Sequence, residues 1–387
     1  MKNRISSIDI VRGLVMIIMV LDHTRDLFHE TALTQQPTDL ATTTLPLFFT
    51  RWITHLCAPT FVFLSGVSAW LSLQNKSSIK AHRRFLLSRG IWLIILELTL
   101  VNFGIWFDIH FSVILIQVIF AIGFGFVILS LLLSLRGIAI LITGIVIMVL
   151  SGLLPLLALP QQNTVTTILN VFFQPAFIPL SEKHNVIYGY PPLPWLAIML
   201  AGFGSAAIFV KEVAIVRKIC IQAGIALIIL FMVLRTINIY GDATPWSWQK
   251  NSAFSFISFL NVTKYPPSLQ YTVLFLGFMF LLLAVFTNKQ NRFSDILAVY
   301  GKVPLFFYLV HWYLIHAALI AVILSNGFST SDLVFGFNFG RPQAFKGFSL
   351  PVVYGVWLLA ILVLYPLCKW YGHYKAAHRT NKWLSYL

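Results

Sequence analysis

The sequence has 387 residues, of which 58% are hydrophobic and only 10% are charged, whereas a soluble globular chain carries about 25% charged residues. This composition excludes a water-soluble globular protein and indicates an integral membrane protein. The formal net charge of +15 would suggest a nucleic-acid partner in a soluble chain. In a membrane protein, however, lysine and arginine report topology, so we expect no nucleic-acid partner.

Apolar segments long enough to cross a hydrocarbon core of about 30 Å recur along almost the whole chain. A window of about 19 residues predicts ten spanning helices. They cover residues 9–29, 46–73, 86–107, 112–134, 137–158, 192–210, 217–237, 268–287, 301–325 and 350–371. The spans leave no room for a sizeable soluble domain, so we predict one all-α transmembrane domain, a bundle of about ten helices over residues 1–387.

Basic residues concentrate in alternate loops. One set of loops comprises the N-terminus, Lys76 to Arg89, Arg136, Lys211 to Lys218, Lys289 to Lys302 and the tail from Lys369. The opposite set holds few basic residues in longer loops at 30–45, 159–191 and 238–267. Because cytoplasmic loops carry the excess of lysine and arginine, both termini are predicted to be cytoplasmic.

The stretch "LDHTRDLFHE" places ionisable residues where the first span should still be finishing. These residues are Asp22, His23, Arg25, Asp26 and His29. On a helix with about 100° per residue they form one polar face. Ionisable groups at bilayer depth cost about 2.5–3.5 kcal/mol each, so this face should point into the bundle.

The second span brings Arg51 and His55 to the same side of the membrane, four residues apart on one helical face. Together these groups predict an acid–base site. We expect catalytic roles for His23, His55, Asp22, Asp26 and His29, and acceptor-binding roles for Arg25, Arg51 and His311. The alternative is that the charges only pair helices and that the histidines hydrogen-bond to backbone carbonyls.

Donor binding is expected at the cytoplasmic end, where arginine forks suit phosphate groups. The candidate residues are Arg12, Arg83, Arg84, Arg89 and Lys302. Arg12 lies on nearly the same helical face as His23 and about 16 Å from it. The alternative for each residue is an ordinary positive-inside anchor. The cysteines, Cys57, Cys220 and Cys368, lack metal-ligand spacing, so no metal is expected.

The order of several segments resembles a known family. They are "RISSIDIVRGLVMIIMVLDH", "APTFVFLSGVSAWLS", "KYPPSLQY" and "YGKVPLFFYLVHWYLIH". The sequence resembles bacterial membrane proteins grouped with the heparan-alpha-glucosaminide N-acetyltransferase catalytic domain. The opening pattern S-x-D-x-x-R-G, here Ser7, Asp9, Arg12 and Gly13, is its most specific part.

This resemblance implies a multi-span acyltransferase in a bacterial inner membrane, which moves an acetyl group from cytosolic acetyl-CoA to an amine or hydroxyl on the far side. In the lysosomal enzyme the reactive histidine lies in the first non-cytosolic loop. The loop from Glu30 to Pro46 has no histidine here, so His29 is its nearest counterpart. Expected partners are membrane lipids and a small-molecule or glycan acceptor, and a homodimer is left open.

Two other functions use the same residues. A proton-coupled transporter or flippase would employ the Asp, His and Glu groups, including Glu97, as a proton relay. A structural membrane protein would use them only to pair helices.

Sidedness is directly testable by cysteine labelling. We expect the loops at 76–89, 211–218 and 289–302 to be cytoplasmic because they are basic. In Ser78→Cys and Ser181→Cys variants, a membrane-impermeant thiol reagent added outside should therefore label only position 181. Labelling of position 78 but not 181 would reverse the topology.

Overall fold

The computed structural model describes residues 5–73, 78–154, 164–378, 381 and 384, and it is mostly helical. The α-helices are α1 (Ser6–Phe28), α2 (Leu45–Thr54), α3 (Cys57–Leu73), α4 (Ile79–Leu96), α5 (Asn102–Trp106), α6 (Val118–Leu132), α7 (Gly137–Leu153), α8 (Thr164–Phe173), α9 (Pro192–Ser205), α10 (Val213–Ile237), α11 (Ser252–Leu260), α12 (Leu269–Phe286), α13 (Arg292–Gly301), α14 (Pro304–Ser325) and α15 (Leu350–Ala377). The π-helix η1 (Glu97–Val101) joins α4 to α5, and the 3₁₀ helices are η3 (Ala206–Val210), η4 (Thr330–Asp332) and η5 (Gly336–Asn338).

Seven of the described helical segments are long and apolar enough to cross a membrane. They are Leu45–Leu73, Ile79–Trp106, Pro192–Val210, Val213–Ile237, Leu269–Phe286, Pro304–Ser325 and Leu350–Ala377, and each overlaps a predicted span. Of the other three predicted spans, α1 has 23 residues but carries charges near both ends, and α6 and α7 are apolar helices of 15 and 17 residues. The predicted span 137–158 ends outside the described residues. A multi-pass helical fold follows, while the count of ten and the cytoplasmic termini stay predictions.

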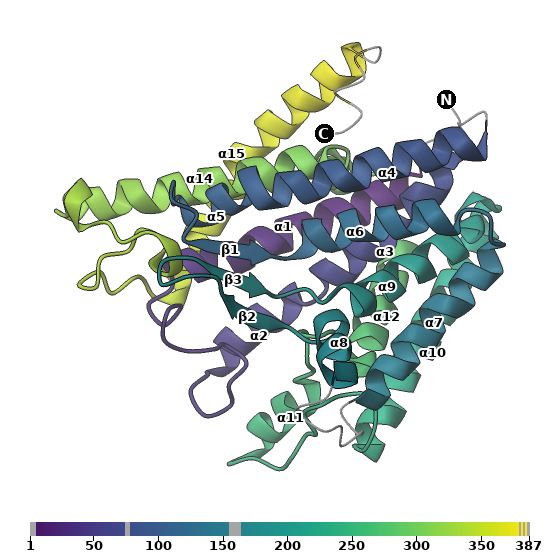
Figure 1. Cartoon of the computed structure of the whole chain (residues 1–387), viewed down its shortest axis with the longest axis horizontal. Coiled ribbons are helices and arrows are strands. Elements are labelled where there is room, and N and C mark those ends of the chain that lie inside the picture. The colour runs from purple at the N-terminus through teal and green to yellow at the C-terminus, as the bar shows by residue number, and fades with distance from the viewer. Residues whose placement is uncertain (1–4, 74–77, 155–163, 379–380, 382–383, 385–387) are drawn as a thin grey trace.

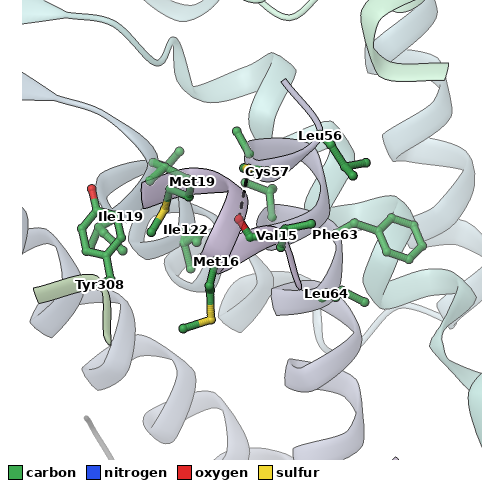
Figure 2. Close-up of a cluster of buried hydrophobic side chains, with 14 of the residues drawn as sticks. Val15, Met16, Met19, Leu56, Cys57, Phe63, Leu64, Ile119, Ile122 and Tyr308 are labelled. Carbon is green, nitrogen blue, oxygen red and sulfur yellow. Dashed lines mark hydrogen bonds between the residues drawn. The ribbon is translucent and has the colours of Figure 1, made fainter. Parts of the chain in front are cut away.

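Helix α1 lies at the centre of the bundle (Figure 1), in contact with α2, α3, α12, α13, α14 and α15. Its apolar side chains Val11, Val15 and Val20 are fully buried. Figure 2 shows Met16 and Met19 of α1 packed beside Leu64 of α3 and Ile122 of α6. Burial on all sides explains why the polar face of α1 has to find its partners within the protein.

The expectation of an all-α fold is wrong at one place, because a small sheet occupies one end of the bundle (Figure 1). It consists of β1 (Val113–Ile116), β2 (Ala176–Pro179) and β3 (Asn185–Tyr188) in the order β1-β3-β2. Strand β3 pairs parallel to β1, with Val113 opposite Asn185, and antiparallel to β2, with Ala176 opposite Tyr188. The predicted span 112–134 therefore begins as a strand, and α6 starts only at Val118.

Polar side chains of the preceding helix make this break possible. Asn102 donates to the Leu115 carbonyl at 3.0 Å and accepts from the Leu115 N–H at 2.6 Å. The Glu97 carboxylate accepts from the Gln117 N–H at 2.8 Å, directly before α6. A carboxylate is favourable at a helix N-terminus. Glu97 thus serves as a helix cap through one oxygen, while its other oxygen is buried without a hydrogen-bond partner among the described residues, and its role in a proton relay stays a prediction.

The segment from 238 to 268 is organised by Arg235 at the end of α10, which is only 1% exposed. Its guanidinium donates to the carbonyls of Thr244, Ser258, Phe259 and Asn261 and to the side-chain oxygen of Gln270. Asp242 binds Thr263 and Ser268 in the same segment. These bonds fix the position of the residues between Thr263 and Ser268, which reach the site described below.

The closest contact of α1 is with α13, where two glycines face each other. A Cβ added to Gly13 would collide with the Leu297 carbonyl, and one added to Gly301 would collide with the Asp9 carbonyl. Small residues that allow backbones to approach are typical of helix contacts in membranes. Gly13 and Gly301 therefore cannot accept a side chain unless the two helices separate.

We expect Gly13→Ala to lower the free energy of unfolding by about 1–3 kcal/mol or more, the usual result of overpacking. Gly355→Ala in α15 is the matched control, because a Cβ there meets nothing within 4 Å. Alanine is favoured over glycine inside a helix by roughly 0.5–1 kcal/mol, so the control should be neutral or slightly stabilised. Melting temperatures in detergent measure both, and equal values would contradict the close contact.

Candidate active site

The polar face of α1 forms a buried ion-pair cluster with α2. Arg25 donates to Asp22 at 2.9 Å and to Asp26 at 2.6 Å, and Arg51 donates to the other carboxylate oxygen of Asp22. Asp22 and Arg25 are 6% and 3% exposed. The two carboxylates balance the two guanidinium groups. Because both arginines are bound to carboxylates, their predicted role with an acidic acceptor gains no support from this geometry.

His23 lies next to this cluster and pairs with a histidine from a distant helix. Its Nδ1 is 2.7 Å from Nε2 of His311 on α14, and its ring stacks on Trp312 with centroids 4.0 Å apart. The structure thus pairs His23 with His311. The sequence predicts that His311 binds the acceptor, but the His311 ring contacts His23 and has no exposed surface.

The hydrogen bonds of His311 define which nitrogen of His23 can accept a proton. Nδ1 of His311 is 3.2 Å from the Phe307 carbonyl, which can only accept, so Nδ1 carries the hydrogen. A neutral His311 then presents Nε2 as an acceptor, and Nδ1–H of His23 donates to it. His23 is left with its basic lone pair on Nε2.

The other two predicted histidines lie away from His23, and their predicted catalytic roles stay predictions. His55 lies between α2 and α3, its carbonyl accepts from the Tyr271 hydroxyl at 2.8 Å, and its ring meets Tyr271 and Phe275 edge-on at 5.7 Å. His29 ends α1: its Nδ1 is 3.0 Å from the Thr31 hydroxyl, and its carbonyl accepts from Arg341 at 3.1 Å. Neither ring lines the cavity beside His23.

A cavity of about 30 Å³ adjoins His23, which is room for about two water molecules. Its polar lining includes Asp22, His23, Gln117, Tyr190, Lys264 and Tyr308. Met19, Cys57 and Tyr308 also belong to the apolar cluster in Figure 2, where the dashed line marks the bond from Cys57 Sγ to the Val15 carbonyl at 3.2 Å. The cavity is therefore a small polar space above a tightly packed apolar floor.

Sequence reasoning missed Lys264, which is only 9% exposed. Its ammonium lies 5.0 Å from the Tyr265 ring and lines the cavity. Because the ion-pair cluster is balanced within itself, Lys264 adds a positive charge beside His23. The segment "NVTKYPPSLQY" contained the signal, since a lysine among turn-forming residues in a long loop is a binding candidate. Gln117 and Tyr190 were missed as well.

The predicted donor-binding residues lie at the other end of the bundle and do not form one cluster. Arg12 donates to Ser68 at 3.0 Å and to the Gly301 carbonyl at 3.4 Å, so it joins α1 to α3 and α13 and lies near Lys302. The remaining three, Arg83, Arg84 and Arg89, are on α4, where Arg83 donates to the Ser130 carbonyl of α6 at 2.9 Å. Arg83, Arg84 and Lys302 are exposed. Of the five predicted donor-binding residues, Arg12 and Arg89 are partly buried.

Residues 4–245 match the protein family described as heparan-alpha-glucosaminide N-acetyltransferase, catalytic. No curated protein gives a significant match. The matched segment contains α1, α2, η1 and the three strands, and it ends before Lys264 and His311.

Proposed function

Since the chain belongs to the heparan-alpha-glucosaminide N-acetyltransferase catalytic family, we propose that it transfers an acetyl group across the membrane. The donor is cytosolic acetyl-CoA, and the acceptor is an amine or hydroxyl of a glycan or lipid-linked molecule on the non-cytoplasmic side. The observation that carries this proposal is the pair of His23 and His311 beside a cavity with Lys264.

In the proposed reaction His23 is the general base. Its Nε2 takes the proton of the acceptor amine or hydroxyl, whose nitrogen or oxygen attacks the thioester carbonyl carbon. The carbon–sulfur bond then breaks, and the proton passes to the CoA thiolate as it leaves. His311 holds the His23 ring through the hydrogen bond at Nδ1, as the orienting member of a triad does.

The charges around His23 suit this reaction. The positive charge that Lys264 adds beside His23 favours a neutral imidazole, which is the form that can act as a general base. The ammonium of Lys264 and the amide of Gln117 line the same cavity, where they can stabilise the negative charge that develops on the carbonyl oxygen. Acyl transfer needs a general base and hydrogen-bond donors within one small space. Here His23 is the base, and Lys264 and Gln117 are the donors.

The proposal is tested first at the histidines. His23→Ala should lower acetyl transfer by about 10²–10⁴-fold, the typical contribution of a positioned base, with little change in melting temperature. His311→Ala should also lower turnover, because the His23 ring is then no longer held by its hydrogen bond to His311. Turnover is measured with radiolabelled acetyl-CoA and extracted envelope glycans and lipids, alongside melting temperature in detergent.

His29→Ala and His55→Ala are the comparison variants, because neither ring lines the cavity. Their turnover should fall only in proportion to lost folded protein. Full turnover in His23→Ala, or loss of turnover in a stable His29→Ala, would contradict the assignment of the base.

Lys264 gives a second test. Lys264→Met keeps the length of the side chain and removes its charge, so turnover should fall by about 10²–10³-fold, the usual effect of losing one donor to a developing oxyanion. Lys250→Met is the matched control, because Lys250 lies in the same outer segment, is exposed and covers only the Phe254 ring at 3.8 Å. Equal turnover in the two variants would remove Lys264 from the mechanism.

A further inference from the structure

The small sheet forms a wall of a second, much larger space. This groove has a volume of about 490 Å³, within the range of about 300–1,000 Å³ that ligand pockets occupy. Its lining is mostly aliphatic and aromatic and includes Leu115, Phe177, Ile187, Tyr188 and Tyr265. The described part of the molecule thus offers an apolar space of ligand size beside the strands in Figure 1.

The groove continues into the candidate active site. Gln117 and Tyr190 line both the groove and the cavity beside His23, and Tyr265 of the groove follows Lys264 of the cavity. The side-chain nitrogen of Gln117 is buried and has no hydrogen-bond partner among the described residues. A buried donor of this kind gains from a ligand that brings an acceptor atom. A molecule that passes from the groove into the cavity would therefore pass Gln117, whose nitrogen can bind it once the side chain turns toward it.

The chemistry of the lining selects the class of molecule. A sugar polymer would lose the hydration of many hydroxyls against a wall that offers mainly carbon, and each unpaired polar group is costly to bury. An alkyl or prenyl chain gains free energy from the same surface. Strand β2 beside the groove also exposes apolar side chains, with Phe177 at 59% and Ile178 at 44%, which is favourable in contact with lipid.

We propose that the groove binds the apolar chain of a lipid-linked acceptor, with the amine or hydroxyl of the head group placed in the cavity at His23. This inference rests on the proposed acetyl transfer, and it narrows the acceptor to an amphipathic molecule.

The first experiment compares two acceptors with the same head group, octyl and methyl β-D-glucosaminide, with the full chain in lipid nanodiscs. The kcat/KM for the octyl acceptor should exceed that for the methyl acceptor roughly tenfold or more, because additional methylenes are bound in an apolar pocket. Ala176→Phe fills the groove from β2 and should bring the ratio to about one. Ile178→Phe, on the same strand but outside the lining, should keep the ratio.

The second experiment measures binding without turnover. An octyl β-D-glucosaminide with a photoreactive diazirine in its chain should label residues 175–190, and Ala176→Phe but not Ile178→Phe should reduce this labelling. Groove labelling without any acetyl transfer would support the apolar site and overturn the proposed function. Acetyl transfer to both acceptors with a ratio of one and no groove labelling would overturn the apolar site and leave the proposed function standing.

Discussion

The ion pair between Asp22 and Arg51 is the interaction on which the rest of the site depends. A carboxylate buried inside an apolar bundle has to be neutralised by a partner held in place, because removing one partner leaves an uncompensated charge. Arg51 supplies that partner from α2 and, with Arg25, surrounds Asp22 on two sides. The pair joins α2 to α1, so that Thr54 and Cys57 border the cavity beside His23.

Features that are determined within a single helix or a short motif could be predicted from the sequence. The family, the multi-pass helical fold and the polar face of α1 all follow from local pattern, and the family match over residues 4–245 confirms the resemblance. The partner of His23 could not be predicted, because helical periodicity gives the direction of a side chain but not the helix that packs against it. His311 is 288 positions away along the chain, and only the packing of α14 against α1 brings them together.

The sheet was missed for a different reason. The run Val113–Ile116 is apolar and only Gln117 separates it from the apolar residues of α6, so its pattern cannot be distinguished from the start of a span. Its strand conformation depends on Asn102 and Glu97, two residues of the preceding helical segment that accept hydrogen bonds from the backbone N–H groups of Leu115 and Gln117. These are tertiary contacts, which a local sequence pattern does not reveal. The roles assigned to the site residues remain predictions.

The bonds of Arg235 determine how the outer surface can move. One guanidinium holds carbonyls spread from Thr244 to Asn261, so breaking its contacts would release the whole segment at once. A segment held in this way opens as one cooperative unit. Asp242 ties Thr263 and Ser268 to the same segment, so the position of Lys264 beside His23 is coupled to the contacts of Arg235.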